Sequence, residues 1–339
     1  YLEEKGGHDV IAINTALEEV VSRAAAAHVH KGKTSADATE PAKALQIRQS
    51  LEVVIDSVEN LRDVILERAV EWKDVPHMDA THWYDALPTT FGRPFVFYAE
   101  TLQSDITRLR YAHDNSTVGK WADATGNHHQ ATSLGIDGME LQRRYCERLG
   151  IGHMDAPAQV PSREYLFDIV SAMTRTCATV HSVARYIRWA RSHDVSLLRF
   201  PRKKKGSSAM PHKDVFGGNP ATEEQAGSCF AYMTGALVTS AMTIPFFYGR
   251  DLEGSASDRI ILEGVFKFGD MTIRNIAGVV AKVMLDEKRC MERIERTYGT
   301  STSQQVMLYL TDQRRVENPL PRSEAHDITA ALAAEAYDN

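Results

Sequence analysis

Apolar residues recur mostly at intervals of three and four along the first long stretch of the chain, from Ser35 to Ala69. These apolar positions are Leu45, Ile47, Leu51, Val54, Ile55, Val58, Leu61, Ile65 and Ala69. Such spacing places side chains on one face of an α-helix, and the letters "TSAD" before it can cap the amino-terminal end. The pattern therefore predicts one helix of about nine turns.

Two further runs have the same character. The second alternates steps of four and three through Leu166, Val170, Met173, Cys177, Val180, Ala184 and Ile187, and the third extends from about Ile261 to Met284. Stripes of this length are difficult to bury within one compact domain of ordinary size, so we expect an extended helical bundle that also packs between chains. Alternating strand patterns are nearly absent, and the predicted fold class is all-α.

Composition and charge limit the classes of molecule that this chain is expected to bind. The 339 residues include 39 basic and 45 acidic side chains, so the net charge of −6 offers no overall attraction to nucleic acid or to acidic membranes. No apolar run approaches the roughly 20 residues of a membrane span, and the opening "YLEEKGGHDV" lacks a signal-peptide layout. The four cysteines form no CxxC pair, which disfavours a zinc knuckle or a disulfide framework. We expect a cytoplasmic protein.

The unusual chemistry lies in the breaks between helices. Positions 203–218 read "KKKGSSAMPHKDVFGG", and histidines stand at His8, His30 and His82. A lone histidine near a helix end is more often a cap or a half-buried polar residue, and a basic loop alone is more often simply solvated. Together, hydroxyls and imidazoles with few Asp and Cys neighbours favour an anionic organic substrate over a metal. The sequence thus predicts no metal and no cofactor.

Six segments, read in order, carry a family resemblance: "HDV", "HKGKTSAD", "THWYDALPTTFG", "QVPSR", "GSSAMPHK" with "NPATEE", and "RDLEGSASDR". They resemble the successive signatures of the fumarase/aspartase superfamily over nearly the whole chain, and within it the adenylosuccinate lyase branch. "GSSAMPHK" is the most specific, because His before the Lys is typical of that branch and of carboxymuconate cycloisomerases. The motifs around His8 and His30 favour the adenylosuccinate branch.

The resemblance implies a carbon–nitrogen lyase without cofactor. It would release fumarate from adenylosuccinate by β-elimination to give AMP, and act likewise on the succinyl-carboxamide ribotide of purine synthesis. This chemistry needs a base, together with fixed positive charge at the carboxylate that gains electrons. By resemblance Ser207 is the general base, His82 is the general acid at the departing nitrogen, and His8 assists catalysis.

The resemblance also implies substrate contacts. Lys213 and Asn219 would hold the carboxylate, while Arg250, Ser255 and Arg259 would hold the nucleotide phosphate. The remaining implied contacts are His30, Thr34, Ser35, Thr81, Gln159, Ser208 and Met210. Gly206, Gly217 and Gly218 flank this loop as a closing lid requires, and the basic residues before it could steer an anionic substrate.

The implied architecture has three parts: a partial N-terminal domain at 1–33, a central long-helix domain at 34–286 and a partial C-terminal helical domain at 287–339. The family would form a homotetramer whose helices build a shared core and whose active sites draw on several subunits. The partners are thus a nucleotide substrate and other copies of the chain, with no nucleic acid and no membrane. Further segments are expected before Tyr1 and after Asn339.

Two departures from the family pattern bear on substrate choice. Trp83, Tyr84, Asp85 and Leu87 stand where relatives usually read "THLQPAQPTTFG", so two glutamines are absent and an acidic group is added near His82. "DVFGG" after Lys213 adds four residues before Asn219. Another N-succinyl compound or a cycloisomerase-type acid is therefore the alternative substrate. A non-catalytic helical scaffold is a third reading, disfavoured because the serine, lysine and histidines are all present.

Overall fold

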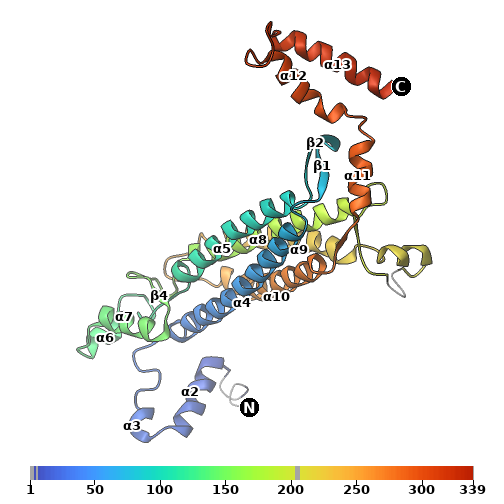
Figure 1. Cartoon of the computed structure of the whole chain (residues 1–339). Coiled ribbons are helices and arrows are strands. Elements are labelled where there is room, and N and C mark those ends of the chain that lie inside the picture. The colour runs from blue at the N-terminus through green and yellow to red at the C-terminus, as the bar shows by residue number, and fades with distance from the viewer. Residues whose placement is uncertain (1–3, 5–6, 203–206, 339) are drawn as a thin grey trace. The chain divides into compact units, whose positions relative to one another are not determined.

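A computed structural model describes residue 4 and residues 7–202 and 207–338 (Figure 1). The helices in this part of the chain are α2 (Asp9–Val20), α3 (Arg23–Ala26), α4 (Ala36–Glu71), α5 (Arg93–Asn115), α6 (His129–Ser133), α7 (Gly138–Leu149), α8 (Glu164–Ala190), η1 (Pro211–Phe216), α9 (Ala221–Met242), α10 (Glu253–Val280), α11 (Glu287–Glu295), η2 (Thr300–Thr302), α12 (Ser303–Thr311) and α13 (Arg322–Asp338). The strands are β1 (Pro76–Thr81), β2 (Tyr84–Thr90), β3 (Val118–Gly119), β4 (Gly152–His153), β5 (Leu198–Arg199) and β6 (Met284–Leu285).

The three long apolar stripes are the helices α4, α8 and α10, which confirms the predicted all-α class. Along α4, the predicted stripe is the buried face: Leu51, Val58, Leu61 and Ile65 are wholly inaccessible to solvent. The hydrophobic period therefore predicted both the helix and the side it buries.

The chain divides into two compact units, and each is described by itself. Unit 1 comprises 1–59, 104–178 and 228–273, and unit 2 comprises 60–103, 179–227 and 274–339. The helices α4, α5, α8, α9 and α10 each contribute a segment to both units. The domain boundaries expected after residues 33 and 286 stay predictions.

In unit 1 polar contacts join long helices that are otherwise held by apolar packing. Ser57 of α4 donates a hydrogen bond to Asp270 of α10 at 2.5 Å, and Arg175 of α8 binds the buried Asp105 of α5 at 2.9 Å. The start of α4 is fixed by Asp37, whose carboxylate accepts hydrogen bonds from Lys120 and from the backbone N–H of Thr34. The "TSAD" segment does begin the helix, and Asp37 supplies the described side-chain contact.

Unit 2 contains the β1–β2 hairpin, which the sequence did not predict. The strands pair antiparallel from Pro76 opposite Thr90 to Thr81 opposite Tyr84, with an irregularity between Met78 and Ala80. Because the accessible and buried positions of neither strand alternate regularly, the period-2 signal of a half-buried strand is missing. An aromatic cluster of Trp72, Phe91, Phe95 and Tyr186 packs beside the hairpin.

All four cysteines are buried with free thiols. Within the described segments, no helix has both the length and the apolar character that crossing a membrane would demand.

His77 on β1 is the one histidine side chain in the described chain that is wholly inaccessible. Its ring and that of Phe91 pack edge to face at a centroid distance of 4.9 Å, and neither nitrogen of the His77 ring has a hydrogen-bond partner among the described residues. Burial, together with the charge of Arg293, lowers the pKa of His77 to about 4, although the carboxylates of Asp79 and Asp85 act in the opposite direction.

We expect this histidine to make stability depend on pH. Since the pKa in the folded state lies below the ordinary value, the neutral ring stabilises the fold fully above about pH 6.5, and this contribution is lost as pH falls toward 4. Between pH 7 and pH 4 the free energy of unfolding should fall by about 3 kcal/mol more in the parent than in His77→Phe. Denaturant titrations at both pH values measure this difference. His326→Phe, at an exposed site, is the control, and parallel curves for the parent and His77→Phe would contradict the expectation.

Candidate active site

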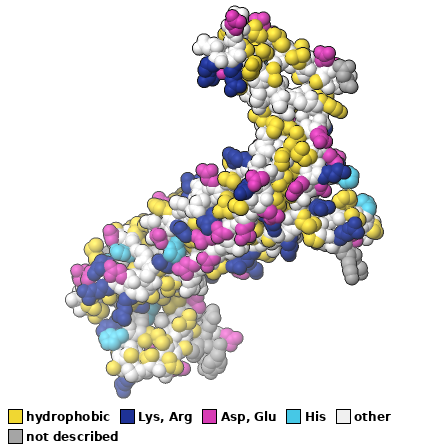
Figure 2. All heavy atoms as spheres, viewed as in Figure 1, with side chains coloured by type: hydrophobic (Ala, Val, Ile, Leu, Met, Phe, Trp, Pro, Cys, Tyr) yellow, Lys and Arg dark blue, Asp and Glu magenta, His cyan; other side chains and the backbone are white. Residues whose placement is uncertain are grey.

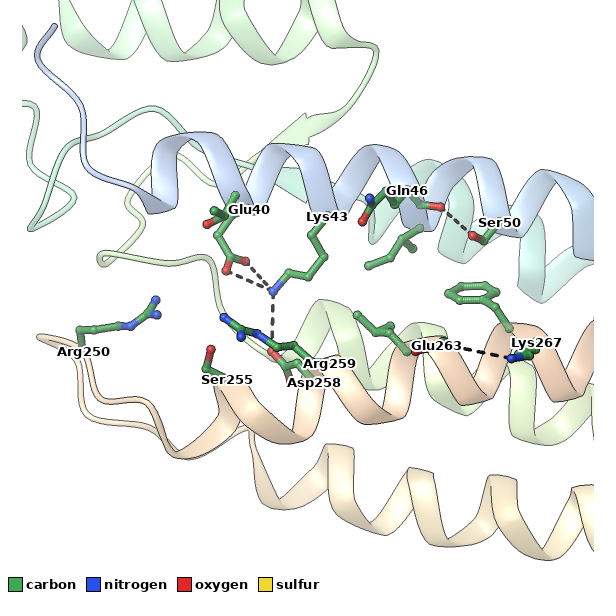
Figure 3. A pocket seen from close by; sticks show the side chains of 14 residues that line it. Glu40, Lys43, Gln46, Ser50, Arg250, Ser255, Asp258, Arg259, Glu263 and Lys267 are labelled. Atoms are coloured by element: carbon green, nitrogen blue, oxygen red, sulfur yellow. Dashed lines mark hydrogen bonds and ion pairs between the residues drawn. The ribbon is translucent and has the colours of Figure 1, made fainter. Parts of the chain in front are cut away.

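A pocket of ≈ 740 Å³ opens in unit 1 between α4 and the start of α10. It brings together Arg250, Ser255 and Arg259, the three residues expected at the phosphate. Figure 3 shows Arg250 pointing from its loop into the space between the two helices, while Ser255 and Arg259 come from successive turns of α10. Arg250 has a φ of 122°, which non-glycine residues rarely adopt, and its Nε atom is buried without a partner among the described residues.

Four charged side chains form a compensated network at the wall of this pocket. Lys43 of α4 binds Glu40 at 2.9 Å and Asp258 of α10 at 3.6 Å (Figure 3). Arg163 binds Glu40 at 3.2 Å and Asp258 at 3.3 Å. Burial by itself would raise the pKa of Glu40, but the charges and hydrogen bonds of Lys43 and Arg163 outweigh it, so the pKa lies below the ordinary value. Two cations thus balance two carboxylates, which leaves Arg250 and Arg259 to meet an incoming anion.

The other expected residues of unit 1 lie outside the described lining of this pocket. His8 is exposed at the N-cap of α2, beside Asp9 at 3.3 Å. His30 follows α3 with a φ of 54°, Thr34 and Ser35 immediately precede α4, and Gln159 lies in the segment before α8.

In unit 2 the loop between β5 and α9 carries the proposed base. Ser207 Oγ accepts a hydrogen bond from the backbone N–H of Met210 at 3.1 Å, and Ser208 and Met210 are exposed. Lys213 Nζ donates to Asn219 Oδ1 at 3.1 Å, so the two expected carboxylate ligands lie together despite the four additional residues. Gly206 and the lysines at 203–205 lie outside the described residues.

The inserted "DVFGG" is docked against the end of α8. Arg191 donates hydrogen bonds to Glu223 at 2.6 Å and to the carbonyl oxygens of Phe216 and Gly218 at 3.1 and 3.0 Å. Its guanidinium also lies 4.4 Å from the centroid of the Phe200 ring. These residues are therefore held against Arg191 in the loop that ends at Asn219.

His82 occupies the turn of the β1–β2 hairpin together with Trp83, and both have positive φ, 51° and 70°. It lines a pocket of ≈ 380 Å³ with Tyr98, Arg185, Tyr186 and Trp189, among others. Burial raises the pKa of the Tyr186 hydroxyl, which has no hydrogen-bond partner among the described residues. The added acidic residue, Asp85, lines a different cleft, as does Thr81.

Comparisons with known proteins bear on this geometry. Residues 1–230 match the family described as lyase. This chain belongs to the lyase family. It is 28% identical over 340 residues to the adenylosuccinate lyase of Methanocaldococcus jannaschii, covering 99% of this lyase and 71% of the relative. The adenylosuccinate lyase of Bacillus subtilis is 27% identical over 339 residues, covering 99% and 75%.

Solved structures share the fold of this lyase at low identity. A fumarate lyase of Mesorhizobium superposes with a TM-score of 0.83 at 18% identity, covering 99% of this lyase and 73% of that chain. A 3-carboxy-cis,cis-muconate lactonizing enzyme of Pseudomonas putida gives 0.82 at 22% identity, covering 99% and 72%. These likenesses establish the helical fold, and they do not distinguish one substrate from another.

Sequence reasoning missed the charged network and the aromatic wall around His82. Glu40 and Lys43 stand three residues apart on α4, and Arg163 is the last letter of the quoted "QVPSR". A charge pair at that spacing is ordinarily read as a solvated helix face, so only their burial reveals the network. For Tyr98 and Tyr186 the sequence holds no separate signal, because aromatic residues on helices mostly fill cores.

Gly217 tests how firmly this lyase holds the inserted loop. It has a φ of 83°, and a Cβ there would lie 2.5 Å from the Cβ of Phe200. Gly217→Ala should displace the loop and accelerate hydrogen exchange across residues 211–219 by about tenfold or more, because the clash with Phe200 adds to the roughly 1–2 kcal/mol that a left-handed backbone costs a non-glycine residue. Gly135→Ala is the matched control, because its φ of 71° is similar and a Cβ there meets no atom within 4 Å. Unchanged exchange in Gly217→Ala would show that Phe200 does not fix the loop.

Proposed function

We propose that this lyase cleaves adenylosuccinate to AMP and fumarate, and the succinyl-carboxamide ribotide of purine synthesis in the same way. Similarity to adenylosuccinate lyases over 99% of the chain supports the proposal. The proposed compartment is the cytoplasm, and the reaction uses no cofactor.

The pocket of Arg250, Ser255 and Arg259 is the observation that carries the proposal. Adenylosuccinate has a phosphate, whereas a carboxymuconate has carboxylates alone. Two guanidinium groups and a hydroxyl suit the oxygens of a phosphate, and the neighbouring carboxylates are already neutralised by Lys43 and Arg163. The pocket therefore favours a nucleotide over the acids of the cycloisomerases with the same fold.

The reaction is an elimination with balanced proton transfer. Ser207 acts as its alkoxide, after its hydroxyl proton has passed to solvent, and takes the proton from the carbon next to a succinyl carboxylate, which restores the hydroxyl. Lys213 and Asn219 stabilise the negative charge that this carboxylate gains. The electron pair then forms the double bond of fumarate while the C–N bond breaks. His82 gives a proton to the departing nitrogen, since a histidine can donate near neutral pH, and His8 and His30 orient the succinyl and phosphate groups.

A second candidate, cleavage of another N-succinyl compound, is motivated by the inserted "DVFGG" beside Lys213 and Asn219. A spectrophotometric assay with adenylosuccinate, with its nucleoside lacking phosphate and with a carboxymuconate separates the possibilities. We expect turnover of adenylosuccinate to AMP and fumarate. Activity only on a substrate without phosphate would overturn the proposal.

Replacement of the base should separate chemistry from binding. Ser207→Ala is expected to lower kcat by at least about 10²–10⁴-fold, because general base catalysis is typically worth that much, and to leave the Kd for AMP nearly unchanged, since the phosphate pocket is untouched. Single-turnover assays and AMP titrations measure the two quantities. A kcat within a few-fold of the parent would move the base elsewhere, with Ser208 and His212 the next candidates.

We further propose that the chain forms a homotetramer whose subunits share active sites. Large apolar side chains stay exposed along the long helices of the single chain, and hydrophobic side chains also gather over α2 and over α12 and α13 (Figure 2). Those on the long helices include Val53, Val70, Val96, Phe97, Val238, Met242, Ile260 and Met271. Burial between subunits would remove this apolar surface from water.

Sedimentation should find a particle of four chains. Val238→Lys, on an exposed part of α9, should shift it toward smaller species and reduce activity in parallel, because active sites would lose residues from neighbouring subunits. Glu147→Lys, on the exposed side of α7, serves as the charge-changing control. A fully active monomer would rule out both the tetramer and the shared sites.

A further inference from the structure

The position of His82 depends on how the β1–β2 hairpin is held. His82 and Trp83 form the whole turn between Thr81 and Tyr84, the last pair in register. Because a two-residue turn has little freedom of its own, the imidazole moves with the strands. Asp85 on β2 pairs with Ala80 of β1, three residues from His82.

Asp85 is bound by two arginines, Arg293 on α11 and Arg296 just after that helix. The helix α11 lies beside the β1–β2 hairpin (Figure 1). Its Oδ1 accepts a hydrogen bond from Arg293 Nε at 2.6 Å, and its Oδ2 accepts from Arg296 Nη2 at 2.9 Å and Nε at 3.3 Å. Both carboxylate oxygens are therefore occupied by guanidinium groups. Asp85 is thus a structural anion of the hairpin rather than a second acid beside His82.

Arg293 links this anion to the pocket that contains His82. The side chain of Arg293, on α11, is 7% exposed, and its guanidinium lies 5.1 Å from the ring centroid of Trp189. Trp189 lines the same pocket as His82, and α11 packs against β1. Arg293 thus contacts the hairpin through Nε and Nη2, which both meet Asp85 Oδ1, at 2.6 and 2.5 Å. The same guanidinium also lies beside Trp189, an aromatic wall of the pocket.

We propose that Asp85 and Arg293 are positioning residues that fix the turn carrying His82 against the wall formed by Trp189. The inference rests on the proposed role of His82. It gives a physical reason for the acidic residue at a position where the family pattern quoted above reads proline: a carboxylate is the partner that a buried arginine requires. The paired contact of Nε and Nη2 with Asp85 and the cation–π contact with Trp189 both favour Arg over Lys at position 293.

The test compares kcat and KM in Asp85→Asn, Asp85→Glu, Arg293→Lys and Arg296→Gln, each in the assembled enzyme with adenylosuccinate. Asp85→Asn should lower kcat by about 10- to 100-fold with a much smaller change in KM, because misplacing a catalytic group by about 1 Å costs this much. Asp85→Glu should recover part of the loss. Arg296→Gln is the matched control, since Arg296 binds the same carboxylate from an exposed position. It should lower kcat by less than about fivefold.

The decisive comparison is made in the His82→Gln background. If Asp85 acts through His82, Asp85→Asn should cause no further loss of kcat there. An equal loss in both backgrounds, or a parental kcat in Asp85→Asn, would overturn the inference. A parental kcat in His82→Gln alone would instead refute the role of His82 in the proposed function. Melting curves of each variant identify any protein that fails to fold. If a single variant does not fold, the double variant Asp85→Asn/Arg293→Gln replaces it, because it leaves neither member of the pair as a lone buried charge.

Discussion

A charge removed from water needs a partner of opposite sign, and this requirement determines where the functional segments of the chain are held. Asp37 with Lys120 fixes the start of α4, Arg191 with Glu223 docks the loop of Ser207, and Asp85 with Arg293 anchors the hairpin of His82. Removing one member of a buried pair typically costs about 3–5 kcal/mol, because the other charge is left uncompensated. Each pair therefore fixes one geometry at a place where apolar packing alone would tolerate several.

Charge pairing also shapes the proposed phosphate pocket, where it leaves two cations available to a ligand. Glu40, Lys43, Arg163 and Asp258 form ion pairs with one another, so their charges cancel at the pocket wall. Arg250 and Arg259 are then the cations available to an anion. A negative protein can in this way offer a local site for a multiply charged substrate, because the field that the ligand meets is set by the nearest uncompensated groups.

The long helices and the loops contribute different kinds of residue to the candidate site. The helices give rigid rows of side chains, as with Glu40 and Lys43 on α4, while Ser207, His82 and Arg250 all lie in connections. Loops can adopt backbone conformations that helices exclude, and His82 and Arg250 both have positive φ. Such conformations persist only where the surroundings hold them, which the buried ion pair beside His82 illustrates.

The sequence by itself determined the three long helices and their buried faces, because a helical period is a local property of the chain. It also determined the residues that matched family motifs, and Arg250, Ser255 and Arg259 do meet in one pocket. The hairpin stayed hidden, because its strands lack alternation and its turn consists of His82 and Trp83 rather than glycine. Only the tertiary structure decided that Asp85 binds Arg293, and that Glu40, Lys43, Arg163 and Asp258 form one network. Those partners lie between 3 and about 220 positions apart in sequence, and the burial that makes their pairing obligatory exists only once the chain has folded.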